Sequence, residues 1–448
     1  MYGANVAVVE PHGLDAIDAA ERHGSPRDLF GLWFGANAET ANFAVGIIAV
    51  SLYGTSLFGA IAGLALGSLL GYAAVSLVSL AGPRFGLPQM MISRKVFGRD
   101  GNVLFAILAF LAGVGWYSID CIFGAQAVAA LLHVVYPLAL ALTLAGTIVI
   151  AVYGYNAIHV FERFGAVTML IGFAIIAGVV LGRAHLNAPF DPHAPFAAGG
   201  EIGGIAFSAA LAFAYAIGWA PCASDYARYL PAASSPRAIG LWAFAGGFLA
   251  SLSLEILGAA AATTVRGPGI AGATPAETVG LLAGTNGALA VIGLLTVLVG
   301  TLNGNVMNLY SGALSALVAA AAAGWRLIRW QAALAVGLVG GALAIVGSDP
   351  VATAHVYGNF LGLLSTWAAP WAAIMIATRG ITRERYGRRA LIAWAVGIAA
   401  GLPFWQQSWF VGPVAAAHPE LGDVSYFVSF AVAYAIVAAG APALRSRK

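Results

Sequence analysis

The sequence has little charge, little lysine and little cysteine, and each shortage excludes a class of protein. Charged residues make up 9% of the 448 residues and apolar residues 60%, which excludes a soluble globular domain. Cys121 and Cys222 both lie in apolar runs, so neither a disulfide framework nor a Cys-x-x-Cys metal site is expected. With two lysines and no GxxxxGK[ST] motif, the chain has no signature of an ATP-driven pump. It also lacks HExxH and GxSxG, which would indicate hydrolysis. Transport is the class that remains, and no enzymatic activity is expected.

What the sequence does have is a series of apolar runs of about 20 residues, the length that crosses a bilayer as a helix. They predict an all-α polytopic membrane protein with twelve transmembrane helices. The expected spans are 28–52, 56–81, 102–131, 136–154, 162–183, 201–230, 237–262, 289–320, 325–346, 354–377, 389–405 and 424–443.

The positive charges predict how the chain is oriented. Residues 1–27 are polar and contain no apolar core of a signal peptide, so we interpret them as a cytoplasmic tail. When the loops are then assigned alternately to the two sides, only Arg183 and Arg266 of the 21 Lys and Arg residues lie outside. This predicts a protein of the inner (plasma) membrane with both termini in the cytoplasm. The net charge of +3 reflects this orientation, and no nucleic-acid partner is expected.

Three stretches between the spans have a character of their own. Residues 82–101 are basic and amphipathic, which predicts an interfacial helix on the cytoplasmic side. Residues 184–200 predict an outer loop, in which two histidines without a third ligand do not indicate a metal site. Residues 263–288 contain PAETVGLLAG, which is too short for a span and could form an outer cap.

Glycines repeat every fourth residue in the second span, at Gly59, Gly63, Gly67 and Gly71. This spacing places them on one face of a helix, where two backbones can approach closely. We favour tight helix packing as their role over a sliding surface.

Two predicted spans contain features that interrupt a helix. The first span places Asn37, Glu39, Thr40 and Asn42 in the middle of an apolar run. In the sixth span Gly218 and Pro221 bracket Trp219, and the proline removes a backbone donor, so a break is expected. Interrupted helices in corresponding positions of two halves are typical of inverted-repeat transporters with a substrate between the breaks. The alternative is two ordinary kinks.

Polar side chains in two further spans are candidates for the same site. Trp116 and Asp120 lie one turn apart on the third span, and Asp at mid-bilayer costs roughly 2.5–3.5 kcal/mol unless it faces a cavity or a partner. We favour a cavity over a structural role satisfied by the eighth span. That span carries Asn303, Asn305 and Asn308, whose carboxamides both donate and accept, as the edge of a heterocycle requires. Asparagine also clasps helices together, so we expect one or two of the three to contact ligand.

Other acidic residues have competing interpretations. Glu255 in the seventh span is equally a proton carrier or a partner for a neighbouring hydroxyl. Asp225 and Arg228, three residues apart, predict an ion pair at the inner gate rather than a ligand contact.

Five stretches across most of the chain resemble the nucleobase:cation symporter-1 family, the purine–cytosine permeases. They are WFGANAETANFAVG from Trp33, GPRFGLPQMMISRKVFGRDG from Gly82, GWAPCASDYARYLP from Gly218, NLYSGALS from Asn308 and YGNFLGLLSTWAAPW from Tyr357. The resemblance implies the leucine-transporter-type fold, with two inverted five-helix repeats over 28–183 and 201–377 and two trailing helices over 389–443. It also implies alternating access and import of a nucleobase-like ring driven by Na⁺ or H⁺.

The resemblance also implies roles for individual residues. Trp116 matches the tryptophan that stacks on the ring, and Trp219 matches the aromatic residue on the other face, beside the main chain at Gly218. Asp120 departs from the family pattern, which often has glutamine there, and a carboxylate accepts without donating. This favours a ring that presents N–H groups or a positive charge, and it disfavours hydantoin-like recognition. The amides on the family's eighth helix match Asn303, Asn305 and Asn308. The polar break in its first helix matches Asn37, Glu39 and Asn42.

The coupling ion is left open between Na⁺ and H⁺, and no cofactor is expected. The Na⁺ site that the resemblance implies uses carbonyls from about Ala36 to Thr40 and hydroxyls on the eighth span, where Thr301 is the one well-placed hydroxyl. Glu39, Asp120 and Glu255 make H⁺ equally plausible, and we favour H⁺ slightly.

The sequence thus predicts a monomeric importer of cytosine or a purine, sandwiched between two indoles. Stacking contributes roughly 1–3 kcal/mol per face, so hydrogen bonds at the ring edge must provide discrimination. One alternative is a vitamin precursor or another amine-bearing heterocycle of the thiamine or pyridoxine type. Another is a receptor or channel that binds ligand without coupled movement.

Overall fold

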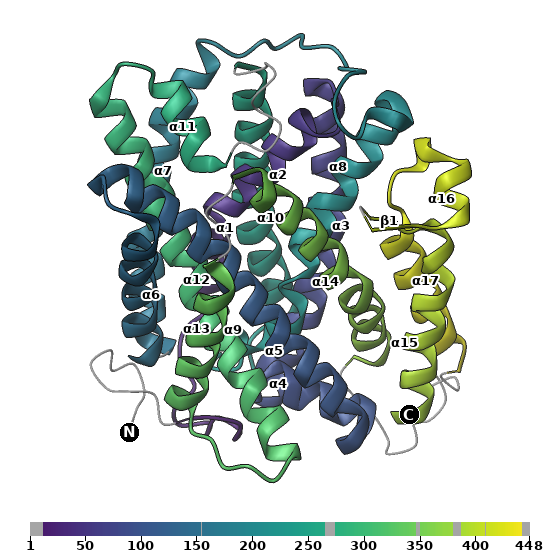
Figure 1. The fold of residues 1–448 in the computed structure, drawn as a ribbon. Helices are drawn as coiled ribbons and strands as arrows, with labels where there is room; N and C mark the ends of the chain where they lie inside the picture. The colour runs from purple at the N-terminus through teal and green to yellow at the C-terminus, as the bar shows by residue number, and fades with distance from the viewer. Residues whose placement is uncertain are drawn as a thin grey trace.

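The computed structural model describes residues 12–153, 155–264, 274–345, 350–379, 387–407 and 409–440, and these form a bundle of tilted helices (Figure 1). The first half contains α1 (Asp28–Asn37), α2 (Thr40–Ser51), α3 (Leu57–Ser79), α4 (Ala81–Phe85), α5 (Gln89–Leu132), α6 (Tyr136–Tyr153) and α7 (Tyr155–Leu181). The next part contains η1 (Ala197–Gly199), α8 (Gly200–Ile217), η2 (Ala220–Cys222), α9 (Ala223–Ala227), α10 (Pro236–Thr264), α11 (Pro275–Ala283), α12 (Gly287–Ala322), α13 (Arg329–Ala344) and α14 (Pro350–Thr378). The last part contains α15 (Gly387–Gly401), η3 (Leu402–Phe404), β1 (Gln406–Gln407), β2 (Phe410–Val411), α16 (Pro413–Ala417), η4 (Pro419–Leu421) and α17 (Ser425–Gly440).

The composition of these helices suits a membrane. Among the described residues, six helical stretches are long and apolar enough to cross one, and four further apolar helices are shorter. Large apolar side chains point outward along them, for example Leu66 on α3, Phe164 on α7 and Leu338 on α13. An apolar outer surface of this kind is stable in hydrocarbon and would aggregate in water.

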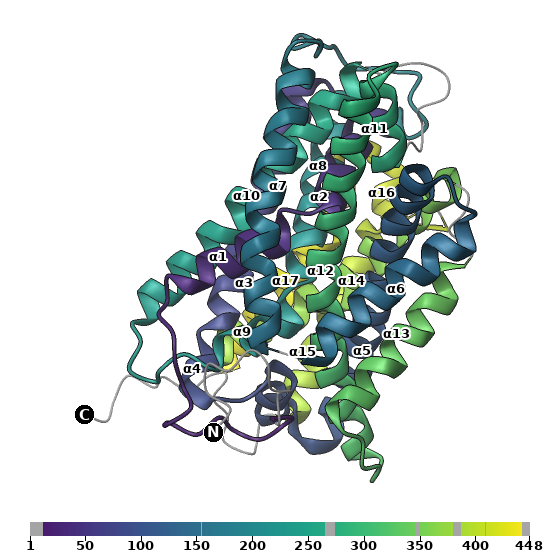
Figure 2. The same ribbon diagram turned by 90° about the vertical axis from the view of Figure 1, so that its left-hand side faces the viewer.

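The two ends of the bundle differ. Residues 12–27 and α4 lie at one end, which we name the tail side, and β1, β2 and α11 lie toward the other, the hairpin side (Figures 1 and 2). The tail is fixed to its end by hydrogen bonds, since Ile17 N donates to Gly86 O at 2.9 Å and Arg22 Nη1 donates to Pro83 O at 2.7 Å. The described end of α17 is also on the tail side (Figure 1).

Both predicted helix breaks are confirmed. Helix α1 stops at Asn37 and α2 starts at Thr40, with Glu39 between them in an extended conformation. Asn42 Nδ2 donates to the Asn37 carbonyl at 2.7 Å, which satisfies an acceptor that the break frees. In the second case α8 stops at Ile217, and the short η2 and α9 follow after Gly218 and Trp219.

The packing interpretation of the four glycines on α3 is also confirmed. Each of them lies against α8, and a Cβ added at Gly63 or Gly67 would meet the backbone of α8 at Ile205 or Ala209. A second close contact joins α5 to α12, where Gly113 lies against Gly312. The broken helix α8 is thus held by a neighbour that approaches to backbone contact.

Other expectations are met with changes. The interfacial segment 82–101 is divided between α4 and the beginning of α5, and Gly98 interrupts α5 with φ of 77°. The outer cap appears as α11, which begins with a capping box at Thr274 and Glu277. An all-α fold did not predict the short antiparallel hairpin of β1 and β2, which precedes α16 and α17. The boundaries of the two repeats stay a prediction.

Candidate functional site

The two broken helices meet in the centre of the bundle. The ring of Trp33 on α1 packs edge-on against Trp219, with centroids 5.7 Å apart. Glu39, in the break between α1 and α2, accepts a hydrogen bond from the hydroxyl of Tyr215 on α8 through Oε1. The breaks therefore lie side by side, and their polar residues are buried in the interior.

A small cavity of about 30 Å³ lies at this junction. Four of the predicted site residues line it: Trp116, Gly218, Trp219 and Asn308. It also reaches Ala109 on α5 and Ser315 on α12, one or two turns farther toward the tail side. Ligand pockets usually hold about 300 Å³ or more, so this conformation is too tight for a heterocycle and the site must widen to accept one.

An aromatic layer covers Trp116. The rings of Tyr215, Tyr357 and Phe360 lie with centroids 5.3, 6.0 and 5.2 Å from that of Trp116, all at steep angles. A Cβ at Gly218 would press on the Trp116 indole and on Leu364, so glycine is what allows α8 to end so close to the ring. None of these three aromatic residues was assigned a role from the sequence, because aromatic side chains are common in apolar helices and do not by themselves mark a site.

The polar groups of α5 and α12 pair with one another. Asn308 Nδ2 donates to Asp120 Oδ2 at 2.9 Å, which ties the predicted edge-binding carboxyl to the wall of the cavity. Asn305 Nδ2 donates to Tyr117 O at 3.3 Å and to Cys121 Sγ at 3.1 Å, the helix-clasping role. Asn303 lies against Gly165 of α7, where it would collide with any larger side chain. The asparagine nearest the cavity is therefore Asn308, and ligand contact by any of the three stays a prediction.

Three buried carboxyl groups share one arrangement. Glu39, Asp120 and Glu255 each have one oxygen that accepts from a neighbour, namely Tyr215, Asn308 and Ser68 respectively. The other oxygen of each has no hydrogen-bond partner among the described residues. No basic side chain pairs with any of the three there, and leaving a buried carboxylate uncompensated is unfavourable.

Two of the three residues predicted for a cation site, Thr40 and Thr301, converge on one carbonyl. Thr40 Oγ1 on α2 and Thr301 Oγ1 on α12 both donate to Val297 O, at 2.9 and 2.8 Å. Thr40 thus supplies the second hydroxyl that the sequence did not place beside Thr301. Ala36 is fully buried one residue before Asn37, whose Oδ1 accepts from Tyr72 at 2.5 Å. Hard oxygens suited to Na⁺ are therefore present, although their role as ligands is untested.

The predicted inner gate is built around two buried charged residues. Asp225 Oδ1 accepts from Gln89 N at 2.7 Å, where α5 begins. Arg228 is fully buried and donates to Gly13 O at 2.9 Å and to the Tyr310 hydroxyl at 3.0 Å. Residues of the tail, α9 and α12 therefore close the tail side together. An ion pair between Asp225 and Arg228 stays a prediction.

Comparison with protein families identifies relatives over nearly the whole chain. Residues 16–429 match the family described as permease for cytosine/purines, uracil, thiamine, allantoin. A purine-cytosine permease of Emericella nidulans is 31% identical, with 95% of this chain and 87% of that protein covered. A putative purine-cytosine permease of Bacillus subtilis is 27% identical, with 95% and 94% covered. A vitamin B6 transporter of Saccharomyces cerevisiae is more distant, at 21% identity over 84% of this chain and 66% of its own length.

Solved structures confirm the predicted fold. Mhp1, a nucleobase-cation-symport-1 family transporter in a closed conformation with bromovinylhydantoin bound, superposes with a TM-score of 0.73 at 18% identity. The match covers 96% of this chain and 94% of Mhp1. A Na⁺-coupled sialic acid symporter matches with a TM-score of 0.54 at 12% identity, covering 92% and 93%. The helices of this chain therefore have the leucine-transporter-type arrangement.

Proposed function

Because the chain belongs to the nucleobase:cation symporter-1 family, the permeases for cytosine/purines, uracil, thiamine and allantoin, we propose that it imports cytosine or a purine by cation symport. It is a multi-pass membrane protein, and its polar residues are gathered inside the bundle. The single observation that carries the proposal is the cavity at the helix breaks, where Trp116, Gly218, Trp219 and Asn308 meet.

The chemistry of this cavity suits a flat ring with N–H groups. In the widened state the two indoles supply faces on which the ring stacks, each contributing roughly 1–3 kcal/mol. Asp120 accepts from N–H groups of the ring, while the Asn308 carboxamide accepts and donates at the same edge. The main chain at Gly218 is open to the ring because no side chain covers it.

Alternating access requires that the two ends of the cavity open in turn. On the hairpin side the layer of Tyr215, Tyr357 and Phe360 over Trp116 acts as the outer gate. On the tail side the contacts of Arg228 with Gly13 and Tyr310 act as the inner gate. The distribution of Lys and Arg assigns the tail side to the cytoplasm, with both termini there.

Proton coupling is favoured over Na⁺ coupling. Glu39 lies in the break between α1 and α2, with one oxygen free to bind a proton among the described residues. A proton neutralises this carboxyl without the several hard oxygens that Na⁺ needs. The convergence of Thr40 and Thr301 on Val297 supports Na⁺ as the alternative.

A vitamin-type heterocycle is the less favoured substrate. Support for it comes from the accept-only Asp120, which suits an amine-bearing ring, and from the distant vitamin B6 transporter. The buried carboxyl groups of Glu39, Asp120 and Glu255 do not require an amine-bearing substrate, because proton coupling explains them equally well.

Uptake of labelled cytosine and adenine into a host without nucleobase permeases tests the proposal. We expect uptake that unlabelled cytosine or a purine inhibits and that pyridoxine and thiamine leave unchanged. Trp116→Ala should raise KM about tenfold or more because one stacking face is lost. Trp325→Ala, at a 70% exposed position, is the matched control.

The same assay separates the coupling ions and the alternatives. A protonophore should abolish accumulation, while replacement of Na⁺ by choline should not change it. If no nucleobase competes for uptake, the substrate class is wrong. If labelled base equilibrates without accumulating in proteoliposomes with a pH gradient, the protein is a channel or receptor.

A further inference from the structure

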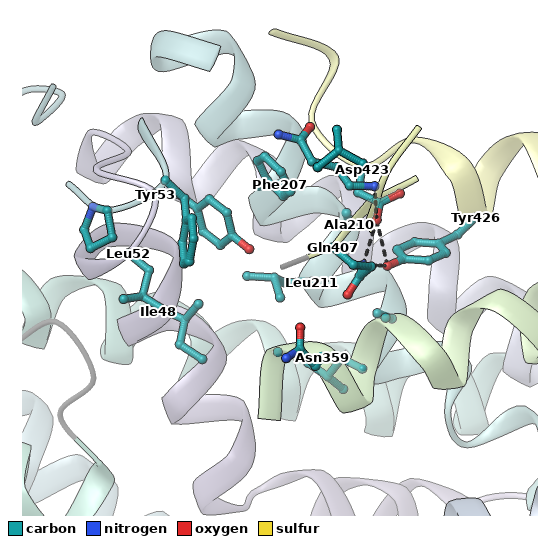
Figure 3. Close-up of a pocket in the computed structure, with 18 of the residues that line it drawn as sticks. Ile48, Leu52, Tyr53, Phe207, Ala210, Leu211, Asn359, Gln407, Asp423 and Tyr426 are labelled. Atoms are coloured by element: carbon teal, nitrogen blue, oxygen red, sulfur yellow. Dashed lines mark hydrogen bonds between the residues drawn. The ribbon is translucent and has the colours of Figure 1, made fainter. Parts of the chain in front are cut away.

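A second and larger cavity lies on the hairpin side, away from the helix breaks. It holds about 310 Å³, roughly ten times the central cavity, and falls in the size range of ligand pockets. Its walls come from the end of α2, the segment before η1, α8, α14, the β1–β2 hairpin and the start of α17 (Figure 3). This pocket could not be predicted from the sequence, because most of its lining residues are apolar and far apart in the chain.

One wall of this hairpin-side pocket is flat and aromatic. Tyr53 stacks on Phe207 of α8 with centroids 4.3 Å apart and planes 19° apart, and Phe196 leans on Tyr53 at 5.7 Å. Ile48 and Leu52 continue this wall along α2 (Figure 3). Such a surface packs best against a flat, apolar face.

The polar groups of the pocket are few and neutral. The hydroxyl of Tyr53 and the carboxamide of Asn359 on α14 point into the cavity from different sides (Figure 3). Burial raises the pKa of Tyr53, so its hydroxyl remains a donor as well as an acceptor. Gln407 Nε2 donates to Asp423 Oδ2 at 2.9 Å and to the Tyr426 hydroxyl at 2.8 Å, which leaves its carbonyl oxygen as the acceptor.

The one acid in the lining offers no charge to a ligand. Asp423 Oδ2 also accepts from Gln406 N and from Tyr426, and Oδ1 accepts from the backbone and the hydroxyl of Ser425. Burial raises the pKa of Asp423, which further disfavours an exposed negative charge. The pocket therefore suits a neutral molecule with mixed donors and acceptors on its edge.

The position of the pocket links it to the central site. Ala210, Leu211 and Ala214 of α8 line it, and the next residue, Tyr215, is already part of the aromatic layer over Trp116. On α14, Gly358 and Asn359 line the pocket, while their neighbours Tyr357 and Phe360 contact Trp116. The two cavities thus lie on opposite sides of one closed layer.

We propose that the hairpin-side pocket is a second binding site, which holds a neutral planar heterocycle outside the closed aromatic layer. The ligand class rests on the proposed function, since the pocket lies across the aromatic layer from the central cavity. A molecule bound there is separated from the central site by the rings of Tyr215, Tyr357 and Phe360. It enters the central site when these rings move apart.

Counting bound ligand tests this proposal. Purified full-length protein in nanodiscs is equilibrated with labelled adenine or cytosine, and the number of molecules bound per chain is measured at saturation. We expect two high-affinity molecules per chain for the wild type and one for Trp116→Ala, in which the central site loses at least tenfold in affinity and is no longer counted.

A larger side chain in the hairpin-side pocket should prevent binding of the molecule there. Gly358 lines the pocket and a Cβ there would meet nothing within 4 Å, so Gly358→Leu adds bulk at the wall of the cavity without a backbone clash. We expect Gly358→Leu to bind one molecule per chain and the double variant with Trp116→Ala to bind none. Gly178→Leu, at an exposed glycine of α7 that is equally free of neighbours, is the matched control and should bind two.

The possible results separate this proposal from the proposed function. One molecule per chain that is lost in Trp116→Ala and kept in Gly358→Leu overturns the second site alone. One molecule that is lost only in Gly358→Leu overturns the central site and keeps the second. No binding to the wild type overturns both. If Gly358→Leu does not fold, Asn359→Ala should weaken the second molecule at least tenfold and leave the first unchanged, and equal affinities would overturn the proposal.

Discussion

At the scale of single residues, the most informative feature is a carboxyl group held by an amide in the middle of a membrane protein. Asp120 has one oxygen bound by Asn308 and one that is free among the described residues. A purely structural acid would be expected to use both oxygens, since an unmet buried acceptor is unfavourable. Asp120 does not line the closed cavity itself, but its partner Asn308 does, so its free oxygen is available to a ring once the cavity widens.

Asp120→Asn tests this role. The substitution preserves the size of the side chain and an oxygen that Asn308 can reach, so the protein should fold with little change in Tm. It also introduces a donor where a ring N–H needs an acceptor, and an edge contact of this kind discriminates strongly. We expect uptake of cytosine and adenine to fall at least tenfold. Asp100→Asn, at an exposed position, is the control, and unchanged uptake in Asp120→Asn would remove Asp120 from the site.

The same scale shows what the sequence could predict about the site. Trp116, Trp219, Gly218 and Asn308 were found because an indole, a glycine or an amide is conspicuous in an apolar helix, and the structure brings them to one cavity. The orientation of Asn303 toward Gly165 was not predictable, because it depends on the rotation of α12 against α7. Side-chain periodicity places residues on a face of a helix but does not say which neighbour that face meets.

At the scale of secondary structure, the glycines of α3 set the distance between α3 and α8. Gly67 lies where a Cβ would collide with the carbonyl of Ala209, and carbonyl oxygens of a helix cannot move aside as a flexible side chain can. The position of α8 matters because its last turn carries Tyr215, and the helix ends at Ile217, immediately before the break.

Gly67→Val should therefore force the two helices apart. Overpacking of this type costs typically 1–3 kcal/mol, so we expect Tm in detergent to fall by several degrees, with a loss of uptake that follows the loss of folded protein. Gly178→Val on α7 is the matched control because nothing lies near its Cβ position. An unchanged Tm for Gly67→Val would show that α3 and α8 are not in the close contact described.

Helix breaks were the elements best predicted from sequence, and loops the least. Polar residues and proline within an apolar run have a direct physical effect on the helix, as at Glu39 and Pro221. The β1–β2 hairpin has no such signal, since Gln406 and Gln407 are ordered by contacts with Asp423 and Tyr426 that come from folding. The hairpin-side pocket depends on those contacts and therefore cannot be predicted from the sequence.

At the scale of the whole molecule, the central cavity and the hairpin-side pocket lie on opposite sides of an aromatic layer, and the tail closes the other end. The central cavity extends from Trp116 toward Ala109 and Ser315, that is, toward the tail side. Gly13 of the tail is held by Arg228 close to that side. This conformation is therefore closed on both sides, and the central cavity extends toward the tail side.

Cys222 reports on that path because it lines the central cavity and is half-buried, whereas Cys121 is buried. A membrane-impermeant maleimide should label Cys222 several-fold faster in inside-out vesicles than in right-side-out vesicles, since the thiol is reached from the tail side. Saturating adenine or cytosine should slow labelling because the ligand fills the cavity next to Trp219. Cys222→Ser should abolish labelling. Equal rates from both sides, or rates that do not respond to ligand, would contradict the position of the cavity or its occupation by a nucleobase.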